Sequence, residues 1–423
     1  MEKTESYQHQ DIFSSDFKKM VNIVVYNSLG FFFLDFLIPF IAMLLDSSGI
    51  IMGILFSLRT VGYLISSSFM GFLSDRFNKK ILVSIGSIGR GLSYFIFYYG
   101  IITNSIFMLA IATTFLGIGA GFFWIPFNSL IAQKSHKNNR SKAYGLRSKA
   151  QGKGVFLGAT LGFSFLSFSS GYQLGNMIAY IPLLIFGLAN FYAGYLFFKD
   201  VDETEVIISN KSVENVVNVD SSKKNIINKK WAILAGLVFL ALVMLISAIN
   251  GSIARPFLIP YLLDNLSADA TIATMVYIPS GLVSLTLAAK LGEIADKMNT
   301  YLGVAIGSLS GAIITFLLIN TNNLIIFAIL LSIDVTIATM TGLIIINLFS
   351  RINIKHRGKI LSFQQFSENI GSITGPILGG MLWDTYSSKY PFLISIIVEL
   401  ILIPLYIIAI FFLKPNLEEK YSE

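Results

Sequence analysis

The sequence predicts an all-α integral membrane protein with about twelve transmembrane helices in two pseudo-symmetric six-helix bundles. Three observations lead to this prediction. Hydrophobic residues make up 54% of the 423 residues and charged residues only 13%, whereas a soluble domain carries about 25% charged residues. Apolar runs recur along the whole chain at close to the roughly 20 residues that a helix needs to cross a bilayer. The second half also repeats short segments of the first at a constant spacing.

The apolar runs are predicted to be helices because they lack the ~10-residue alternation of an outer-membrane barrel. Residues 1–19 are polar and predict a cytoplasmic tail rather than a cleavable signal. The bundles are predicted at 20–198 and 231–413, joined by a cytoplasmic linker at 199–230 and followed by a cytoplasmic tail at 414–423. The predicted spans are 20–45, 49–73, 80–102, 104–132, 145–170, 172–198, 231–263, 267–291, 299–320, 322–350, 358–384 and 389–413.

Positive charges lie in alternate loops of this arrangement, which is the positive-inside pattern. They are Arg76, Lys79 and Lys80; Lys134, Lys137, Arg140 and Lys142; Lys211, Lys223, Lys224, Lys229 and Lys230; and Arg351, Lys355, Arg357 and Lys359. We therefore expect a multi-pass protein of the cell membrane with both termini in the cytoplasm. The net charge of +7 reflects this topology, and no nucleic-acid partner is expected.

The two halves repeat one another in register. Phe36-Leu-Ile-Pro-Phe40 reappears as Phe257-Leu-Ile-Pro-Tyr261, and Ile85-Gly-Ser87 as Ile306-Gly-Ser308, both at an offset of 221 residues. Further on the offset is 217 residues, where Gly154, Gly158 and Gly162 match Gly371, Gly375 and Gly379. A constant register over several helices indicates an internal duplication, as in many secondary transporters.

The loop Gly71-Phe-Leu-Ser-Asp-Arg-Phe-Asn-Lys-Lys80 resembles the signature loop between helices two and three of the major facilitator superfamily. A weaker copy, again at the 221-residue offset, lies between the eighth and ninth spans, where that family repeats the motif. The resemblance implies two bundles around a central cavity that work by alternating access. The gate-motif residues that it identifies are Gly71, Asp75, Arg76, Lys80, Gly292, Asp296 and Lys297.

Each part of this gate motif has a physical reason. Glycines allow close helix packing, and a carboxylate such as Asp75 at a helix N-terminus contributes ~0.3–1 kcal/mol. Asn78 and Asn299 stand where the family usually has glycine, and Asn tolerates a left-handed backbone best among the other residues. We therefore predict a left-handed turn there. The alternative for the basic residues is that they only anchor the topology.

Asp35, inside the first span, is the first candidate for a functional carboxylate. Ionisable groups inside spans are costly, at ~2.5–3.5 kcal/mol or more, and need partners or water. An aspartate beside the cavity could take up a proton, and the order Leu34-Asp35 before Ile38-Pro39 resembles the first helix of drug-efflux members. The alternative is a structural ion pair with Arg59 or Arg90.

Other charged and aromatic residues are further candidates for the proton and substrate cavity. Asp334 is a second possible coupling carboxylate. Lys153 and Glu368 could pair across the cytoplasmic gate or contact substrate, while Glu399 is expected to be structural or to snorkel. The complete set of predicted cavity residues is Asp35, Arg59, Arg255, Asp334, Lys153, Glu368 and Trp124. The glycines of helix eleven are expected to serve helix packing more than exchange.

The leading hypothesis is a secondary active transporter for proton-coupled efflux of amphiphilic or drug-like molecules. An importer or facilitator of a polar metabolite is the first alternative, and a non-transporting receptor or scaffold is the second. The sequence shows no nucleophile elbow, HExxH motif or phosphate-binding loop, so no enzyme activity, metal or cofactor is expected. The expected partners are a small-molecule substrate, protons and the lipid bilayer, with the chain acting as a monomer.

Overall fold

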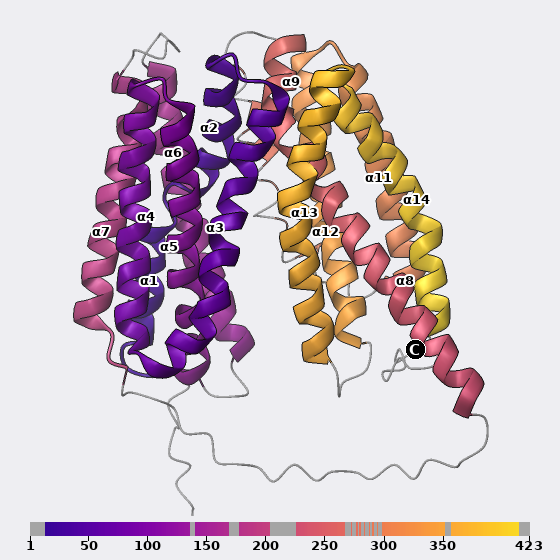
Figure 1. Ribbon diagram of the computed structural model, residues 1–423, viewed down its shortest axis with the longest axis horizontal. Helices are drawn as coiled ribbons and strands as arrows, with labels where there is room; N and C mark the ends of the chain where they lie inside the picture. The colour runs from indigo at the N-terminus through magenta and orange to yellow at the C-terminus, as the bar shows by residue number, and fades with distance from the viewer. Residues whose placement is uncertain are drawn as a thin grey trace, which may run out of the picture. The chain divides into compact units, whose positions relative to one another are not determined.

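The computed structural model of the protein describes residues 13–135, 140–168, 177–203, 226–266, 298–351 and 357–413, with single positions from 272 to 294. In this part of the chain the regular elements are helices (Figure 1). One isolated antiparallel bridge joins Phe13 to Ser135. The all-α prediction is confirmed.

The helices follow the predicted spans closely. The first half comprises α1 (Phe17–Asn27), α2 (Phe31–Leu44), α3 (Gly49–Arg76), α4 (Lys79–Ile102), α5 (Ile106–Gln133), α6 (Arg140–Phe168), the 3-10 turn η2 (Met177–Tyr180) and α7 (Ile181–Asp200). The second half comprises α8 (Ile226–Ile253), η3 (Arg255–Phe257), α9 (Leu258–Asn265), α11 (Thr300–Asn320), α12 (Leu324–Arg351), α13 (Arg357–Thr385) and α14 (Tyr390–Leu413). The predicted eighth span, 267–291, is described only at single positions.

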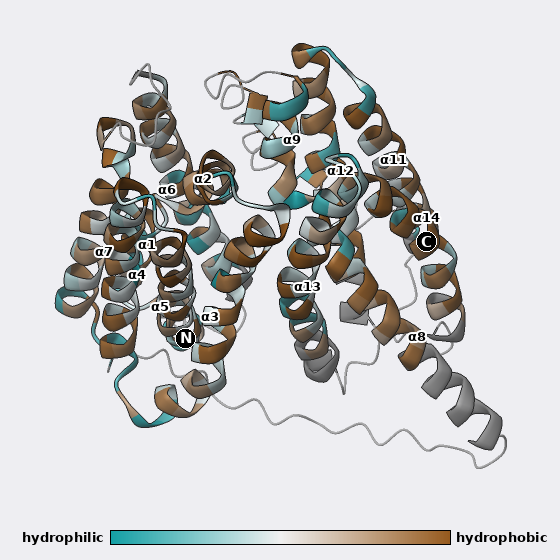
Figure 2. Ribbon diagram, turned by 45° about the horizontal axis from the view of Figure 1, so that its top comes forward, coloured by the Kyte–Doolittle hydropathy of each residue, from teal (hydrophilic) through white to brown (hydrophobic). Residues whose placement is uncertain are grey.

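The chain is a multi-pass membrane protein. Among the described residues, nine helical segments are long and apolar enough to cross a membrane. The helices α6 and α13 are as long, but carry more polar residues, such as Lys149 and Lys153 in α6. Large apolar side chains are exposed along the helices, with Phe107 at 70% and Ile325 at 72%, and Figure 2 shows hydrophobic residues over most of each helix. Lipid, rather than water, suits such surfaces.

The first and seventh spans, which correspond to one another in the duplication, are both interrupted. Between α1 and α2 the helix is interrupted at residues 28–30, and between α8 and α9 the short turn η3 follows Ala254. Pro39 lies in α2 and Pro260 at the matching position of α9. Proline cannot donate the backbone hydrogen bond of a regular helix. An interruption in both of two corresponding spans is typical of substrate sites in duplicated transporters.

The glycine repeats serve helix packing, as expected. A side chain on Gly158 would strike the backbone of Leu29, beside the break between α1 and α2. In the second half, a side chain on Gly375 would meet the carbonyl oxygen of Ile249 in α8 at 2.7 Å. In both halves, therefore, the fifth helix (α6 or α13) packs closely on the first helix of that half through a glycine at the same place in the repeat.

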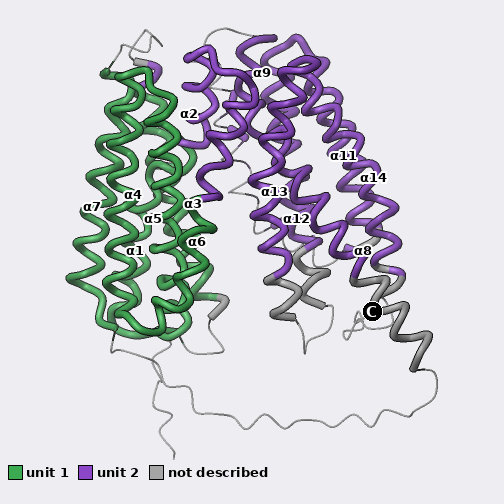
Figure 3. The backbone as a smooth tube through the Cα atoms, in the orientation of Figure 1, with its two compact units in different colours: residues 1–33, 62–165, 177–218 green, residues 34–61, 166–176, 219–423 purple. Residues whose placement is uncertain are grey.

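The chain forms two compact units, each built from separate segments (Figure 3). Unit 1 comprises residues 1–33, 62–165 and 177–218, and unit 2 comprises residues 34–61, 166–176 and 219–423. Most of α2 and the first part of α3 thus belong with the second half of the chain. The division into bundles at 20–198 and 231–413 stays a prediction.

Inside unit 1, the segment before α1 is held by a buried ion pair. Lys134 Nζ lies 2.8 Å from Asp16 Oδ2 and also donates to the carbonyl oxygen of Asp202. Asp16 Oδ2 accepts from the backbone N–H of Asp202 at 2.9 Å. Phe17 and Met20 are buried beside this pair. The start of α1 is therefore fixed to the ends of α5 and α7.

Candidate functional site

Asp35 lies at the centre of a charged cluster in unit 2. Its Oδ1 accepts from Arg59 Nη1 of α3, and its Oδ2 lies 2.9 Å from Arg255 Nη2 of η3. The side chain of Asp35 is 15% exposed, that of Arg59 31% and that of Arg255 57%. One carboxylate thus pairs with two guanidinium groups, which favours its ionised form. The ion pair between Asp35 and Arg59, the alternative considered for this residue, is confirmed.

Aromatic rings flank this cluster. The guanidinium of Arg59 lies 5.5 Å from the ring centre of Phe56. Phe36, next to Asp35 on α2, lies 6.1 Å from the ring of Tyr277, a residue of the predicted eighth span. Rings beside cations add a modest attraction of about 0.5–1 kcal/mol at exposed sites. The charged cluster therefore lies against buried aromatic rings, because Phe36 and Phe56 are both buried.

The helices α3 and α13 pack tightly along residues 49–57 and 373–384, close in sequence to Arg59 of the cluster, and we call this contact the α3–α13 seam. Asp384 of α13 caps the N-terminus of α3, because its carboxylate accepts from the backbone N–H of Gly49 at 2.6 Å and of Ile50 at 3.0 Å. Ser57 Oγ donates to the carbonyl oxygen of Ile373 at 2.8 Å. A side chain on Gly53 would strike the carbonyl group of Pro376. The two helices therefore touch through their backbones.

Both features join segments from opposite halves of the duplicated sequence. Asp35, Arg59 and Gly49 belong to the first half, whereas Arg255, Ile373 and Asp384 belong to the second. Each contact is polar and directional, so a small displacement breaks it. Such contacts can stabilise one of two conformational states and break together when the protein changes to the other.

Trp124, the predicted aromatic cavity residue, lies in unit 1 on α5. The guanidinium of Arg147, on α6, stacks 4.4 Å from its ring, and Phe31 packs against it at 6.1 Å. Arg147 also donates to Gln151 at 3.3 Å. Arg147 was not among the predicted site residues. It could have been identified from the sequence as a basic residue inside the predicted span 145–170.

The other predicted cavity residues have separate surroundings. Asp334 accepts from Thr315 Oγ1 at 3.2 Å, inside unit 2. Glu368 is exposed and accepts from Gln364 at 3.0 Å. Lys153 is exposed on α6. Arg90, the other partner considered for Asp35, donates to Asn27 and stacks over Phe31 at 4.3 Å in unit 1.

The gate motif is described in its first copy only. Asp75 is exposed, Arg76 stacks over Phe72 at 4.0 Å, and Lys80 lies 5.0 Å from the ring of Phe198. The N-terminus of α4 is capped by Glu203, which accepts from the backbone N–H of Lys79 at 3.0 Å. Gly292, Asp296 and Lys297, the second copy, lie outside the described residues.

Two expectations for the first copy were wrong. A side chain on Gly71 would meet no described atom within 4 Å, so the expected close packing is not present there. Asn78 has φ −59° and ψ 118°, and is not left-handed. Its backbone is extended because α4 begins at the next residue and the chain needs only to enter that helix. Among the described residues other than glycine, positive φ occurs instead at Asp46 and Asn104, in the loops after α2 and α4, so the left-handed turn predicted at Asn299 is also wrong.

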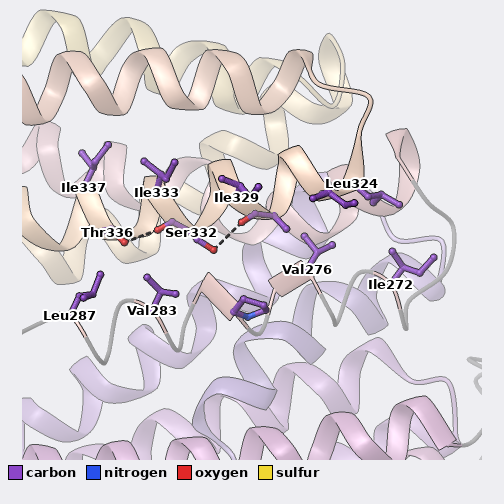
Figure 4. Close-up of a pocket in the computed structure, with 13 residues that line it drawn as sticks. Ile272, Val276, Val283, Leu287, Leu324, Ile329, Ser332, Ile333, Thr336 and Ile337 are labelled. Atoms are coloured by element: carbon purple, nitrogen blue, oxygen red, sulfur yellow. Dashed lines mark hydrogen bonds between the residues drawn. The ribbon is translucent and has the colours of Figure 1, made fainter.

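An apolar groove of about 660 Å³ runs along α12 in unit 2 (Figure 4). Ile329, Ile333 and Ile337 line one side, and residues of the predicted eighth span, such as Val276 and Leu287, line the other. The hydroxyls of Ser332 and Thr336 donate to carbonyl oxygens of their own helix. The groove therefore suits an acyl chain or the apolar part of an amphiphile.

Comparison with known proteins places these features in context. A family model described as Major Facilitator Superfamily matches residues 21–352 and 240–423. The chain is 27% identical over 357 residues to "Multidrug resistance protein MdtG" of Rahnella sp. (strain Y9602), covering 82% of this chain and 81% of that protein. It is 24% identical over 379 residues to the protein of the same name from Escherichia coli O17:K52:H18 (strain UMN026 / ExPEC), covering 81% and 80%.

Solved structures share the fold at low sequence identity. A bacterial homolog of the human lysosomal transporter Spinster, in an inward-facing and occupied conformation, aligns with a TM-score of 0.71 and 13% identity, covering 96% of this chain and 97% of that one. A D-xylose-proton symporter aligns with a TM-score of 0.69 and 15% identity, covering 96% and 98%.

Proposed function

The chain belongs to the Major Facilitator Superfamily and is a membrane transporter with a small-molecule substrate, and from this premise we propose that it is a proton-coupled exporter of amphiphilic or drug-like compounds. It works by alternating access. The proposed setting is the cell membrane, with the chain acting as a monomer and both termini in the cytoplasm. The relatives named as multidrug resistance proteins support the substrate class.

The observation that carries this proposal is the shared carboxylate of Asp35. It holds Arg59 of the first half and Arg255 of the second at the same time. A proton on Asp35, or a cationic substrate beside it, removes the charge that attracts both guanidinium groups. Either event therefore weakens the contact between the halves and favours opening of the α3–α13 seam.

Competition for this carboxylate gives an exchange mechanism. Asp35 can bear a proton or pair with a cationic substrate, but one excludes the other because each uses the same negative charge. With neither bound, the arginines occupy the carboxylate and the seam stays closed. Each opening is then coupled to a bound proton or a bound substrate, which is the condition for antiport.

The apolar surfaces support an amphiphilic substrate. The rings of Phe56 and Tyr277 lie beside the arginines of the Asp35 cluster, and the groove along α12 has an almost wholly aliphatic lining. Flat or aliphatic groups gain about 25 cal/mol for each Å² of apolar area removed from water. We also propose that Trp124 with Arg147, and the gate residues Asp75, Arg76 and Lys80, contribute to the substrate path and the cytoplasmic gate.

Reconstitution in liposomes tests the proposal. The fluorescent cation ethidium is supplied outside proteoliposomes with an acidic lumen, and its uptake is followed with and without nigericin, which collapses the pH gradient. We expect uptake that requires the gradient and is lost in Asp35→Asn. Asp264→Asn, an exposed carboxylate of α9, is the matched control. Flux indifferent both to the gradient and to Asp35→Asn would reject proton coupling through Asp35, and an absence of flux with all cations and neutral amphiphiles screened would reject export.

A further inference from the structure

A buried polar cluster joins three helices of unit 1. Asn27 Nδ2 of α1 donates to Ser87 Oγ of α4 at 3.0 Å and to Asn190 Oδ1 of α7 at 2.9 Å. Arg90 of α4 donates to Asn27 Oδ1. None of the four side chains is more than 1% exposed. The cluster thus combines neutral amides and a hydroxyl with one permanent cation.

Unit 2 contains a second cluster on the corresponding helices. Asn250 Nδ2 of α8 donates to Glu399 Oε2 of α14 at 2.8 Å, and the hydroxyl of Ser308 of α11 also donates to Glu399. In unit 2, α14 packs on α8 and on α11, as α7 packs on α1 and on α4 in unit 1. In both clusters an asparagine on the first helix of the half donates to an acceptor on the sixth.

The second cluster differs from the first in its charges. At the 221-residue offset Ser87 corresponds to Ser308, and Arg90 corresponds to Gly311. Glu399 takes the place of Asn190 as the acceptor. A side chain built on Gly311 would lie 3.6 Å from Glu399 Oε1, so the site of the lost cation faces the gained carboxylate. The second cluster therefore contains an acid, whereas the first contains a permanent cation.

No described cation replaces the missing arginine. Among the described residues, the groups that interact with Glu399 are Ser308 of α11, Asp334 of α12, Asn250 of α8 and Tyr406 of its own helix, and none comes from the described part of α13. Asp334 and Tyr406 are the titratable ones, and neither carries positive charge. An isolated carboxylate inside a membrane is unfavourable unless a cation or a proton neutralises it.

The amide of Asn250 indicates that a proton, rather than a cation, neutralises Glu399. Asn250 is 7% exposed, and its Oδ1 is buried without a hydrogen-bond partner among the described residues. A buried acceptor without a partner destabilises by about 1–3 kcal/mol. A protonated carboxyl and a primary amide form two reciprocal bonds, N–H to C=O and O–H to amide oxygen. A proton on Glu399 would keep the existing bond from Nδ2 and give Oδ1 its donor.

We propose that Glu399, on the last helix of the second half, is a proton-binding residue, with Asn250 recognising the protonated form and Asp334 as the neighbouring carboxylate that exchanges the proton. The proton comes from water on one side of the membrane and leaves as hydronium on the other. The inference rests on the proposed proton coupling and assigns it a second site.

Infrared difference spectroscopy of the purified full-length protein tests this site without any substrate. The carbonyl stretch of protonated carboxyls is followed from about pH 9 to about pH 4, where buried carboxyls titrate. We expect one band that is lost in Glu399→Gln. The same band should be lost in Gly311→Arg, which restores the cation of the first half and keeps Glu399 ionised. Asp264→Asn is the control and should retain the band.

Four outcomes separate this inference from the proposed function. Loss of the band in both variants, with monodisperse protein in each, supports proton binding at Glu399. A band that persists in Glu399→Gln, or the absence of any titrating band in the unmodified protein, overturns it. If the band behaves as expected while ethidium flux ignores the pH gradient, the proton site stands and the proposed coupling fails. Gradient-driven flux without the band would keep the proposed coupling and reject the proton site.

Discussion

At the scale of single residues, Asp35 and Glu399 illustrate two ways to keep a carboxylate inside a membrane. Asp35 has two guanidinium partners, so its charge is matched and it acts through the contacts that it holds. Glu399 has an amide and a hydroxyl, which bind either protonation state. The first arrangement suits a latch between segments, and the second suits reversible uptake of a proton.

The latch can be weakened without touching Asp35. Arg255→Ala removes one of its two ion pairs, and because Arg255 is 57% exposed the loss is expected to be that of a surface pair, about 0.2–1 kcal/mol or about a 1.5- to 5-fold change. Since the chain has no cysteine, Ser57→Cys, at the buried seam, gives a single reporter. Maleimide labelling of this cysteine should be faster by that factor in Arg255→Ala, and nearly unchanged in Arg255→Lys. Equal labelling rates in all three backgrounds would contradict a latch at Asp35.

The residue scale is also where sequence reasoning stopped short. Asp35 and Arg59 could be identified because charges in apolar spans are conspicuous. The bond between Asp35 and Arg255 could not, because it joins positions 220 apart and depends on how the broken first and seventh spans pack. Glu399 was expected to be structural or to snorkel. Only its contacts with Asn250 and Ser308 identify it as part of a repeated cluster.

At the scale of helices, small residues determine which elements can pack together. Gly158 rests on the break between α1 and α2, and Gly375 rests on α8. Gly53 rests on α13 across the seam. The spans and these repeats were predictable because helical length and the 221- and 217-residue offsets are properties of the sequence. The left-handed turn at Asn78 was not, because analogy with a glycine says nothing about whether a helix begins one residue later.

A matched pair of glycine substitutions tests this packing. Gly158→Leu places a side chain against the backbone of Leu29, which cannot move aside, and overpacking of this kind destabilises by about 1–3 kcal/mol. Gly71→Leu enters open space. We therefore expect Gly158→Leu to lower the melting temperature of the detergent-solubilised protein by several degrees, and Gly71→Leu to leave it nearly unchanged. Equal melting temperatures would show that α6 does not rest on this break.

At the scale of the whole molecule, the compact units do not follow the halves of the duplication. Unit 2 takes Leu34–Val61 from the first half and holds it to the second. Its contacts there are an ion-pair cluster and a backbone seam, both of which small movements can break. A transporter that alternates between inward-open and outward-open states must break these contacts in every cycle. Cross-linking the α3–α13 seam therefore tests the mechanism directly.

A reversible disulfide across the seam is the most direct measurement. A Cβ built on Gly49 lies 2.9 Å from Trp383 Cβ, within about 1 Å of disulfide geometry, so Gly49→Cys with Trp383→Cys should cross-link on oxidation. The control pair is Asn265→Cys with Ser388→Cys, whose native side chains bond at 3.3 Å within the second half. The account predicts that ethidium flux stops when the first pair is oxidised and returns on reduction, while the control pair and each single variant transport throughout. Full flux with the Gly49–Trp383 bridge intact would contradict alternating access through this seam.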